Sequence, residues 1–155
     1  MTSDQPTPSS KLRSIAFALL GRREYSASEL KTKLVALGAK IEDIEPLLSE
    51  LMQSNYQSDE RMAGMLVRSN LRKGRGISRI QQDLKKHQID VGLAADEINQ
   101  VDWLQQAIEL RIKKFGALIP KDAKERNRQL RFLQYRGFDL DICFKALNSN
   151  GVEEE

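Results

Sequence analysis

The chain has 155 residues, 40% of them hydrophobic, and its 25 lysines and arginines against 22 acidic residues give a net charge of +3. This length can bury one substantial core or several small cores packed in a row, and the near balance of charge indicates an anionic partner only weakly. One cysteine, Cys143, excludes an internal disulfide, and one histidine, His87, leaves none of the usual zinc spacings. The composition therefore predicts no disulfide framework, no metal site and no cofactor.

The amino-terminal stretch "MTSDQPTPSS" lacks the charged-then-apolar pattern of a secretion signal. The longest apolar run, Ile15–Leu20, is far shorter than the roughly 20 residues of a membrane span. We expect a soluble protein of a reducing compartment. Residues 1–10, rich in proline, serine and threonine, and the acidic residues 149–155 are predicted to be disordered tails.

Apolar residues recurring every three or four positions, with only four prolines, predict an all-helical chain. The first helix is expected near 12–21. Ser26 and Glu29 form a capping-box pattern for a second helix that ends before Gly38. The third helix is expected within 41–53, and Pro46 places its start near residue 43, because proline is tolerated in the first turn.

Asp59 is interpreted as the cap of a long helix that runs to about residue 73, where "GRG" interrupts it. Ser78, with Gln81 three residues later, indicates the start of the next helix, which ends near residue 88. Asp90 is expected to cap a short helix that runs to residue 98. The last third predicts helices at 102–115, 121–135 and 139–147, the first two ended by glycines at 116 and 137.

Apolar columns at fixed spacing indicate an internal repeat. Leu34, Leu84 and Leu133 each stand five residues before a second apolar column and fourteen before a third. Gly38, Gln88 and Gly137 fall at one equivalent place, and Ile44, Leu93 and Ile142 match within one residue. The pattern predicts three tandem three-helix repeats, at 11–55, 56–100 and 101–148, stacked into an elongated, curved molecule.

Catalysis needs positioned groups of complementary pKa, and no motif of this kind is present. The segment "KGRG" lacks both the third glycine of a dinucleotide fingerprint and the Gly-Lys-Ser/Thr of a phosphate-binding loop. His87 is interpreted as a solvated residue or a cap for carbonyl groups, Cys143 as a small core residue, and Trp103 as core in preference to a stacking platform for a nucleobase. The sequence therefore predicts a protein that is not an enzyme.

The segment "RSNLRKGRGISRI", residues 68–80, places five cations and two glycines in thirteen residues. Helical spacing puts Arg68 and Arg72 on one face, and Arg75 and Arg79 lie on and just beyond the glycine turn. The four guanidinium groups are expected to converge at one corner. Cations are favourable at the end of the first helix but unfavourable at the start of the next, so we interpret the cluster as an interaction surface more readily than as a solvated helix end.

Lys73 belongs to the same predicted contact surface, which Lys85 and Lys86 extend. A second basic strip, within "KDAKERNRQLRFLQYR", puts Lys124, Arg128 and Arg131 on one helix face, with leucines 130 and 133 turned inward. The strip is equally compatible with a contact surface and with the ordinary solvated face of a repeat helix.

Three segments resemble the RecX family of bacterial recombination regulators. "YQSDERMAGMLVRSNLRKGRGISRIQQDLKKHQI" (56–89) is similar to the family's central block, "YSASELKTKLVALG" (25–38) to its first repeat, and "RFLQYRGFDLDICFKAL" (131–147) to its carboxyl-terminal block. This chain has Asn55 and Gln57 where the family usually has glycine and leucine. The resemblance covers about residues 25–147 in order and spacing.

This resemblance implies a non-enzymatic protein of the bacterial cytoplasm that binds the RecA recombinase, above all its filament on single-stranded DNA. Such a protein restrains ATP hydrolysis, strand exchange and filament growth by RecA, and so modulates recombination, DNA repair and the SOS response. The family's basic cluster matches Arg68, Arg72, Lys73, Arg75 and Arg79. Weak direct DNA contact is compatible with this reading, a monomer is expected, and the alternative is a single-stranded DNA-binding protein that interferes with recombination by occupying DNA.

Overall fold

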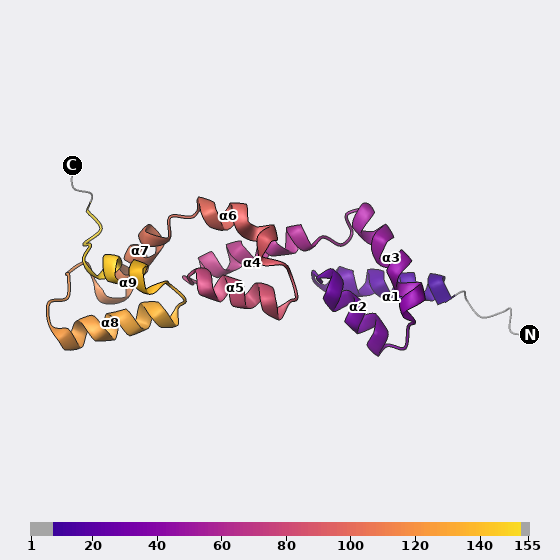
Figure 1. The fold of residues 1–155 in the computed structure, drawn as a ribbon, viewed down its shortest axis with the longest axis horizontal. Helices are drawn as coiled ribbons and strands as arrows, with labels where there is room; N and C mark the ends of the chain where they lie inside the picture. The colour runs from indigo at the N-terminus through magenta and orange to yellow at the C-terminus, as the bar shows by residue number, and fades with distance from the viewer. Residues whose placement is uncertain (1–7, 153–155) are drawn as a thin grey trace, which may run out of the picture. The chain divides into compact units, whose positions relative to one another are not determined.

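The computed structural model describes residues 8–152, and within that range every regular element is helical (Figure 1). The all-helical prediction is therefore confirmed. The elements are α1 (Pro8–Arg22), α2 (Ala27–Ala36), α3 (Ile41–Gln53), α4 (Asp59–Arg72), α5 (Ile77–Lys86), the 3-10 helix η1 (Val91–Ala94), α6 (Ala95–Gln100), α7 (Trp103–Phe115), α8 (Ala123–Tyr135) and α9 (Leu140–Leu147).

The helices form two compact units. Unit 1 contains the described residues up to Ala63 together with Leu84–Leu93, and unit 2 contains Gly64–Asp83 and the described residues from Ala94 onward. The second predicted repeat is thus shared between the units. The repeat boundaries at 55/56 and 100/101 stay a prediction, because the units divide the chain by packing and not by helical period.

Each unit has its own apolar core, built from helix faces with the expected period. In unit 1, α1, α2 and α3 pack around eight buried residues: Leu12, Ala16, Leu30, Leu34, Ile44, Leu47, Leu48 and Leu51. In unit 2, α7 and α8 both pack on α9 around six: Ala107, Ile108, Leu133, Phe138, Cys143 and Ala146. Cys143 is fully buried, so its prediction as a small core residue is confirmed, and burial raises the pKa of its thiol to about 11.

Several helix starts differ from the sequence prediction; for example, α8 begins at Ala123, two residues after its predicted start at 121. Helix α1 begins at Pro8, so residues 8–10 are helical, whereas residues 1–7 of the predicted tail lie outside the described range. Helix α3 begins at Ile41, two residues earlier than Pro46 predicts. Pro46 is its sixth residue and removes only the bond to the carbonyl of exposed Glu42. Ser78 forms no capping box, since α5 starts at Ile77 and the Ser78 amide donates to Gly137 O instead.

The equivalence of apolar positions between the predicted repeats is confirmed at the leucines. At a further set of positions, the structure corrects the register by one residue. Leu34, Leu84 and Leu133 are all fully buried, and the equivalent turn residues 38, 88 and 137 have φ of 96°, 58° and 102°. The match of Ile44 with Leu93 and Ile142 holds within the one residue predicted: Leu93 is 43% exposed, and the residue after it, Ala94, is buried. The buried residues lie ten positions after each leucine, at Ile44, Ala94 and Cys143, so the repeat holds in exact register.

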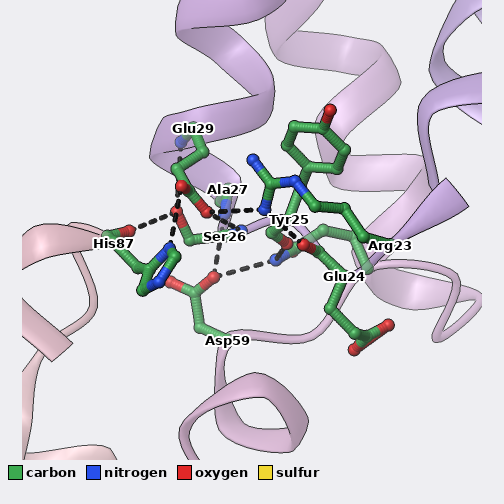
Figure 2. A network of polar contacts seen from close by, with 9 residues as sticks. Arg23, Glu24, Tyr25, Ser26, Ala27, Glu29, Asp59 and His87 are labelled. Carbon is green, nitrogen blue, oxygen red and sulfur yellow. Dashed lines mark hydrogen bonds and ion pairs between the residues drawn. The ribbon is translucent and has the colours of Figure 1, made fainter. Parts of the chain in front are cut away.

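Within unit 1, a polar network joins the start of α2 to the end of α5 (Figure 2). Ser26 and Glu29 form the predicted capping box. Ser26 Oγ also donates to the carbonyl of His87 at 2.5 Å, and His87 Nδ1 lies 2.9 Å from Glu29 Oε2. The prediction that His87 is solvated or caps carbonyl groups is wrong, because its ring is half-buried against Glu29 and its own carbonyl is the acceptor.

Asp59 belongs to the same network and does not cap α4. Its Oδ1 accepts from the Ala27 amide at 2.8 Å, whereas Ser58 Oγ, one residue earlier, accepts from the Arg61 amide. Asp59 Oδ1 also accepts from Nε2 of buried Gln57, whose Oε1 has no partner among the described residues. The Asp59 side chain therefore ties the amino terminus of α4 to that of α2.

Within unit 2, an equivalent joint forms between the start of α5 and the turn that follows α8. Here the backbone makes the contact: the Gly76 amide donates to Arg136 O at 2.8 Å, and the Ser78 amide donates to Gly137 O at 3.0 Å. A Cβ on Gly76 would lie 2.5 Å from the carbonyl atoms of Gly137. Glycine is required at position 76 because the two backbones touch.

Arg111 is fully buried in unit 2 and holds the end of α9. Its guanidinium donates to the Ala146 carbonyl at 3.0 Å and to the Ser149 carbonyl at 2.5 Å. It also donates to Gln129 Oε1 and to the carbonyls of residues 116 and 118. Burial lowers the pKa of Arg111 from its usual value. A buried cation is thus solvated by carbonyl groups in place of water.

Candidate binding surface

The arginines of the predicted basic cluster do not converge at one corner. Arg68 reaches Glu97 of α6 at 3.3 Å, and Arg75 donates to Asn70 Oδ1 at 3.4 Å. Arg79 lies over the Tyr135 ring, 5.2 Å from its centroid. Arg72 is exposed and has no ion pair within residues 8–152. The expectation of a single corner fails because the glycine turn docks on the turn after α8, which directs Arg79 toward Tyr135.

The two glycines of "GRG" serve the chain itself. Gly76 forms the backbone joint with Gly137, and Gly74, with φ of 69°, brings the end of α4 against Leu110 of α7. A Cβ on Gly74 would lie 3.0 Å from Leu110 Cδ1. The glycines therefore permit close intramolecular packing, and nothing about their geometry requires a phosphate ligand.

The close approach of α4 to α7 borders a cavity of about 450 Å³ within unit 2. Its apolar wall consists of Leu71, Leu110 and Phe132. Its polar residues come from the end of α4, from α7 and from the end of α8: Arg72, Lys73, Gln106, Glu109, Lys113, Lys114 and Arg136. Five cations and one carboxylate thus surround a partly apolar hollow.

None of these five cations pairs with a carboxylate of the described residues. Arg136 instead donates to the Lys73 carbonyl at 2.9 Å, at the carboxyl end of α4. Arg136 and Lys114 both lie over the ring of Phe132, at 5.4 Å and 5.8 Å from its centroid. Glu109 accepts from Gln105 Nε2 at 3.1 Å. Five cations against one carboxylate create a positive local potential.

Sequence reasoning found Arg72 and Lys73 but missed the other three cations. Lys113, Lys114 and Arg136 are 40 or more positions away along the chain, and only the packing of α4 against α7 and α8 brings them together. The available signals were the adjacent lysines 113 and 114 in the last turn of α7 and the cation directly before Gly137. Without the folded structure, neither signal shows that these three cations line the same cavity as Arg72 and Lys73.

The remaining predicted contact residues lie elsewhere. Lys85 and Lys86 are exposed in the last turn of α5 and belong to unit 1. In the second strip Lys124 is exposed, Arg128 pairs with Glu125 at 3.1 Å, and Arg131 donates weakly to Asn127 O. The inward leucine at 133 is fully buried, as the strip's helical period predicts.

The other residues considered as candidates for binding or catalysis have structural roles. Trp103 Nε1 donates to Ile98 O at 3.1 Å and its half-buried ring packs against the unit 2 core, as predicted. Over residues 8–152, no three His, Cys, Asp or Glu side chains gather in a way that could hold a metal ion. In the same range no helix is both long and apolar enough to cross a membrane.

Comparisons with known proteins agree with this fold. Residues 58–97 match the family model described as RecX, second three-helix domain, and residues 100–147 match RecX, third three-helix domain. The chain is 49% identical to the "Regulatory protein RecX" of Acinetobacter baylyi over 154 residues, which cover 99% of this chain and 96% of that protein. It is 41% identical to the protein of the same name from Acidithiobacillus ferrooxidans, with coverage of 96% and 94%.

The fold is also similar to a solved structure. The crystal structure of RecX from Lactobacillus salivarius superposes with a TM-score of 0.79 at 21% identity, covering 90% of this chain and 94% of that one. At this identity the likeness establishes the fold alone.

Proposed function

Because the chain belongs to the RecX family of regulatory proteins, we propose that it is a non-enzymatic regulator of the RecA recombinase. In this proposal it binds RecA and the RecA filament on single-stranded DNA. Binding inhibits ATP hydrolysis, strand exchange and filament growth, and so modulates recombination, DNA repair and the SOS response. It acts as a monomer in the bacterial cytoplasm, without a cofactor.

The observation that supports this proposal is the set of exposed cations left without counter-charge. Arg72 and Lys73 at the end of α4 form no ion pair with a carboxylate of the described residues, and neither do Lys85 and Lys86 at the end of α5. Free cations at helix ends are available for an acidic partner. We assign the contact to these four residues together with Arg68, Arg75 and Arg79, and a secondary contact to the strip of Lys124, Arg128 and Arg131.

The test is the steady-state ATPase rate of RecA on saturating single-stranded DNA while this protein is titrated. Wild type is expected to suppress turnover at stoichiometries well below one per RecA, too few to coat the DNA. The contact variant is Arg72→Glu, Lys73→Glu, Lys85→Glu and Lys86→Glu, which is expected to lose inhibition. Lys33→Glu with Lys40→Glu is the control, since both lysines are exposed and unpaired among the described residues of unit 1.

The competing function, occupation of single-stranded DNA, gives a different result. Binding driven by phosphate contacts weakens steeply with salt, with a log-log slope of about −0.7 per contact on single strands. If ATPase suppression follows the coating of DNA and shows this slope, the DNA-binding function replaces the RecA-directed one. Inhibition that survives in the contact variant shows that the basic residues are merely solvated.

A further inference from the structure

The cavity between α4, α7 and α8 has the composition of a peptide site. We infer that it receives an acidic peptide segment of the partner protein, with carboxylates beside an apolar side chain. The inference rests on the proposed function, in which the partner is a protein. It adds residues that lie outside the basic cluster of residues 68–86: Leu110, Lys113, Lys114, Phe132 and Arg136.

Charge identifies the ligand as an anion. Elsewhere in the described chain, ion pairs neutralise exposed cations such as Arg13 with Glu50, at 2.6 Å. Around the cavity, five cations face one carboxylate, Glu109, which itself accepts from Gln105. Exposed cations gathered around a low-polarity hollow repel one another, and an anionic ligand relieves this repulsion.

The wall of the cavity favours a peptide over a nucleic acid. Glu109 and Gln106 present acceptor oxygens among the cations, and a peptide has backbone N–H groups to donate to them. A phosphodiester backbone has acceptors alone and cannot donate a hydrogen bond to Glu109 or to the Gln106 side-chain oxygen.

The one aromatic ring of the cavity is already engaged. Arg136 and Lys114 lie over Phe132, and the Phe115 ring meets it edge-on with centroids 5.2 Å apart. Stacking of nucleobases on aromatic rings is the main sequence-independent grip on single strands. A base would have to displace a cation from Phe132, whereas an aliphatic side chain can pack on Leu71 and Leu110 without displacing anything.

The chain's own glutamates, at positions 153–155, are the nearest competing occupant in sequence. Gly151 lies against Ile112 and Ile108 of α7. At 100° per residue these positions are on the opposite side of the helix from Leu110 and Lys113, which line the cavity. The last described residues therefore leave α7 on the side away from the cavity, which favours an external segment.

The experiment measures binding of a short fluorescein-labelled peptide of alternating glutamate and leucine by fluorescence anisotropy, using the full chain. The cavity variant is Lys113→Glu with Lys114→Glu. Its control is Lys33→Glu with Lys40→Glu, since both lysines are exposed, are unpaired among the described residues and lie outside the lining of the cavity. Circular dichroism verifies that each variant is folded, and Lys113→Gln with Lys114→Gln separates lost attraction from new repulsion.

Wild type is expected to bind the peptide, and the cavity variant is expected to bind about tenfold more weakly, since several rim ion pairs become repulsive. The lysine 33/40 variant is expected to stay within about twofold of wild type, because it makes the same change of charge at residues that do not line the cavity. A peptide with glutamine in place of glutamate is expected not to bind. Equal losses in both variants, or no binding by wild type, overturn the inference.

Two further measurements test whether the cavity binds a nucleic acid or the chain's own residues 153–155. If labelled oligothymidylate binds more tightly than the peptide and depends on Lys113 and Lys114, the ligand is a nucleic acid and the inference fails. If removal of residues 153–155 strengthens peptide binding several-fold, the tail occupies the cavity and the external segment is excluded. A protein that inhibits RecA normally but binds no acidic peptide overturns this inference and leaves the proposed function intact.

Discussion

The same inter-repeat joint is built twice in this molecule, with different chemistry. In unit 1 the start of α2 meets the end of α5 through side chains, with Ser26 and Glu29 contacting His87. In unit 2 the start of α5 meets the end of α8 through backbone atoms, with Gly76 and Ser78 donating to the following turn. Equivalent positions in a repeat can therefore keep their geometry while they exchange polar side chains for direct backbone contact.

The two units also differ in the groups that their cations contact. Unit 1 pairs cations with carboxylates distant in sequence, for example Arg61 with Glu24 at 2.8 Å. In unit 2 the buried cation Arg111 bonds carbonyl and amide oxygens, and five cations around the cavity have no carboxylate partner in the described chain. Among its described residues unit 1 also has unpaired lysines, such as Lys33 and Lys40, but in unit 2 five cations line one cavity, so unit 2 is the better candidate for binding an anion.

Among the proposed substitutions, that of buried Arg111 is expected to lower the free energy of unfolding the most. Arg111→Met removes a fully buried guanidinium that donates to the carbonyls of Ala146, Leu118 and Ser149. Each desolvated carbonyl left without a donor costs about 1–3 kcal/mol, so we expect a loss of about 3 kcal/mol. Arg61→Met, which removes an exposed ion pair of unit 1, is expected to cost about 1 kcal/mol or less. Urea denaturation measures both, and hydrogen exchange locates the first loss in residues 103–147. Equal costs would contradict the structural role of Arg111.

Substitution of Gly76 tests the backbone joint. A Cβ there would meet the Gly137 carbonyl at 2.5 Å, so Gly76→Ala is expected to destabilise the protein by about 1–3 kcal/mol through overpacking. Gly21→Ala is the matched control, because nothing lies within 4 Å of its Cβ position in α1, and alanine there is expected to stabilise by up to about 1 kcal/mol. Thermal unfolding followed by circular dichroism compares the two, and a neutral Gly76→Ala would show that the joint is loose.

The unit 1 joint is expected to depend on pH. Burial pushes the pKa of Glu29 upward, but the Ser26 amide, the hydrogen bond and charge of His87, and the charge of Arg23 outweigh it, so the pKa is lowered from its ordinary 4.5. Stability from ionised Glu29 is therefore complete above pH 4.5 and is lost as pH falls through the lower folded value. Glu29→Gln keeps a capping side chain but removes the charge, and is expected to cost about 0.5–1 kcal/mol at pH 7.

The measurement is the difference in unfolding free energy between wild type and Glu29→Gln from pH 7 to pH 3. The difference is expected to shrink toward zero below pH 4.5. A difference that stays constant over this range would show that Glu29 acts through its shape and not through its charge.

Local patterns predicted the helices well wherever the deciding contacts are local. The capping box of Ser26 and Glu29 was predicted correctly, because its bonds close within three residues. Asp59, Ser78 and His87 were misread, because their partners are 32 or more residues away. A capping residue whose bond is taken by a distant group has the same sequence signature as a true cap.

The amino-acid sequence by itself determined the helical class, the repeat period and the buried leucines at 34, 84 and 133, since these depend on apolar spacing along single helices. It also identified the basic stretch that opens at Arg68. Only the tertiary structure decided that the "GRG" glycines serve an internal joint, that Arg111 is buried, and that Arg72 shares a cavity with Lys113 and Arg136. These contacts join residues distant in sequence, and their partners are chosen by the packing of whole helices.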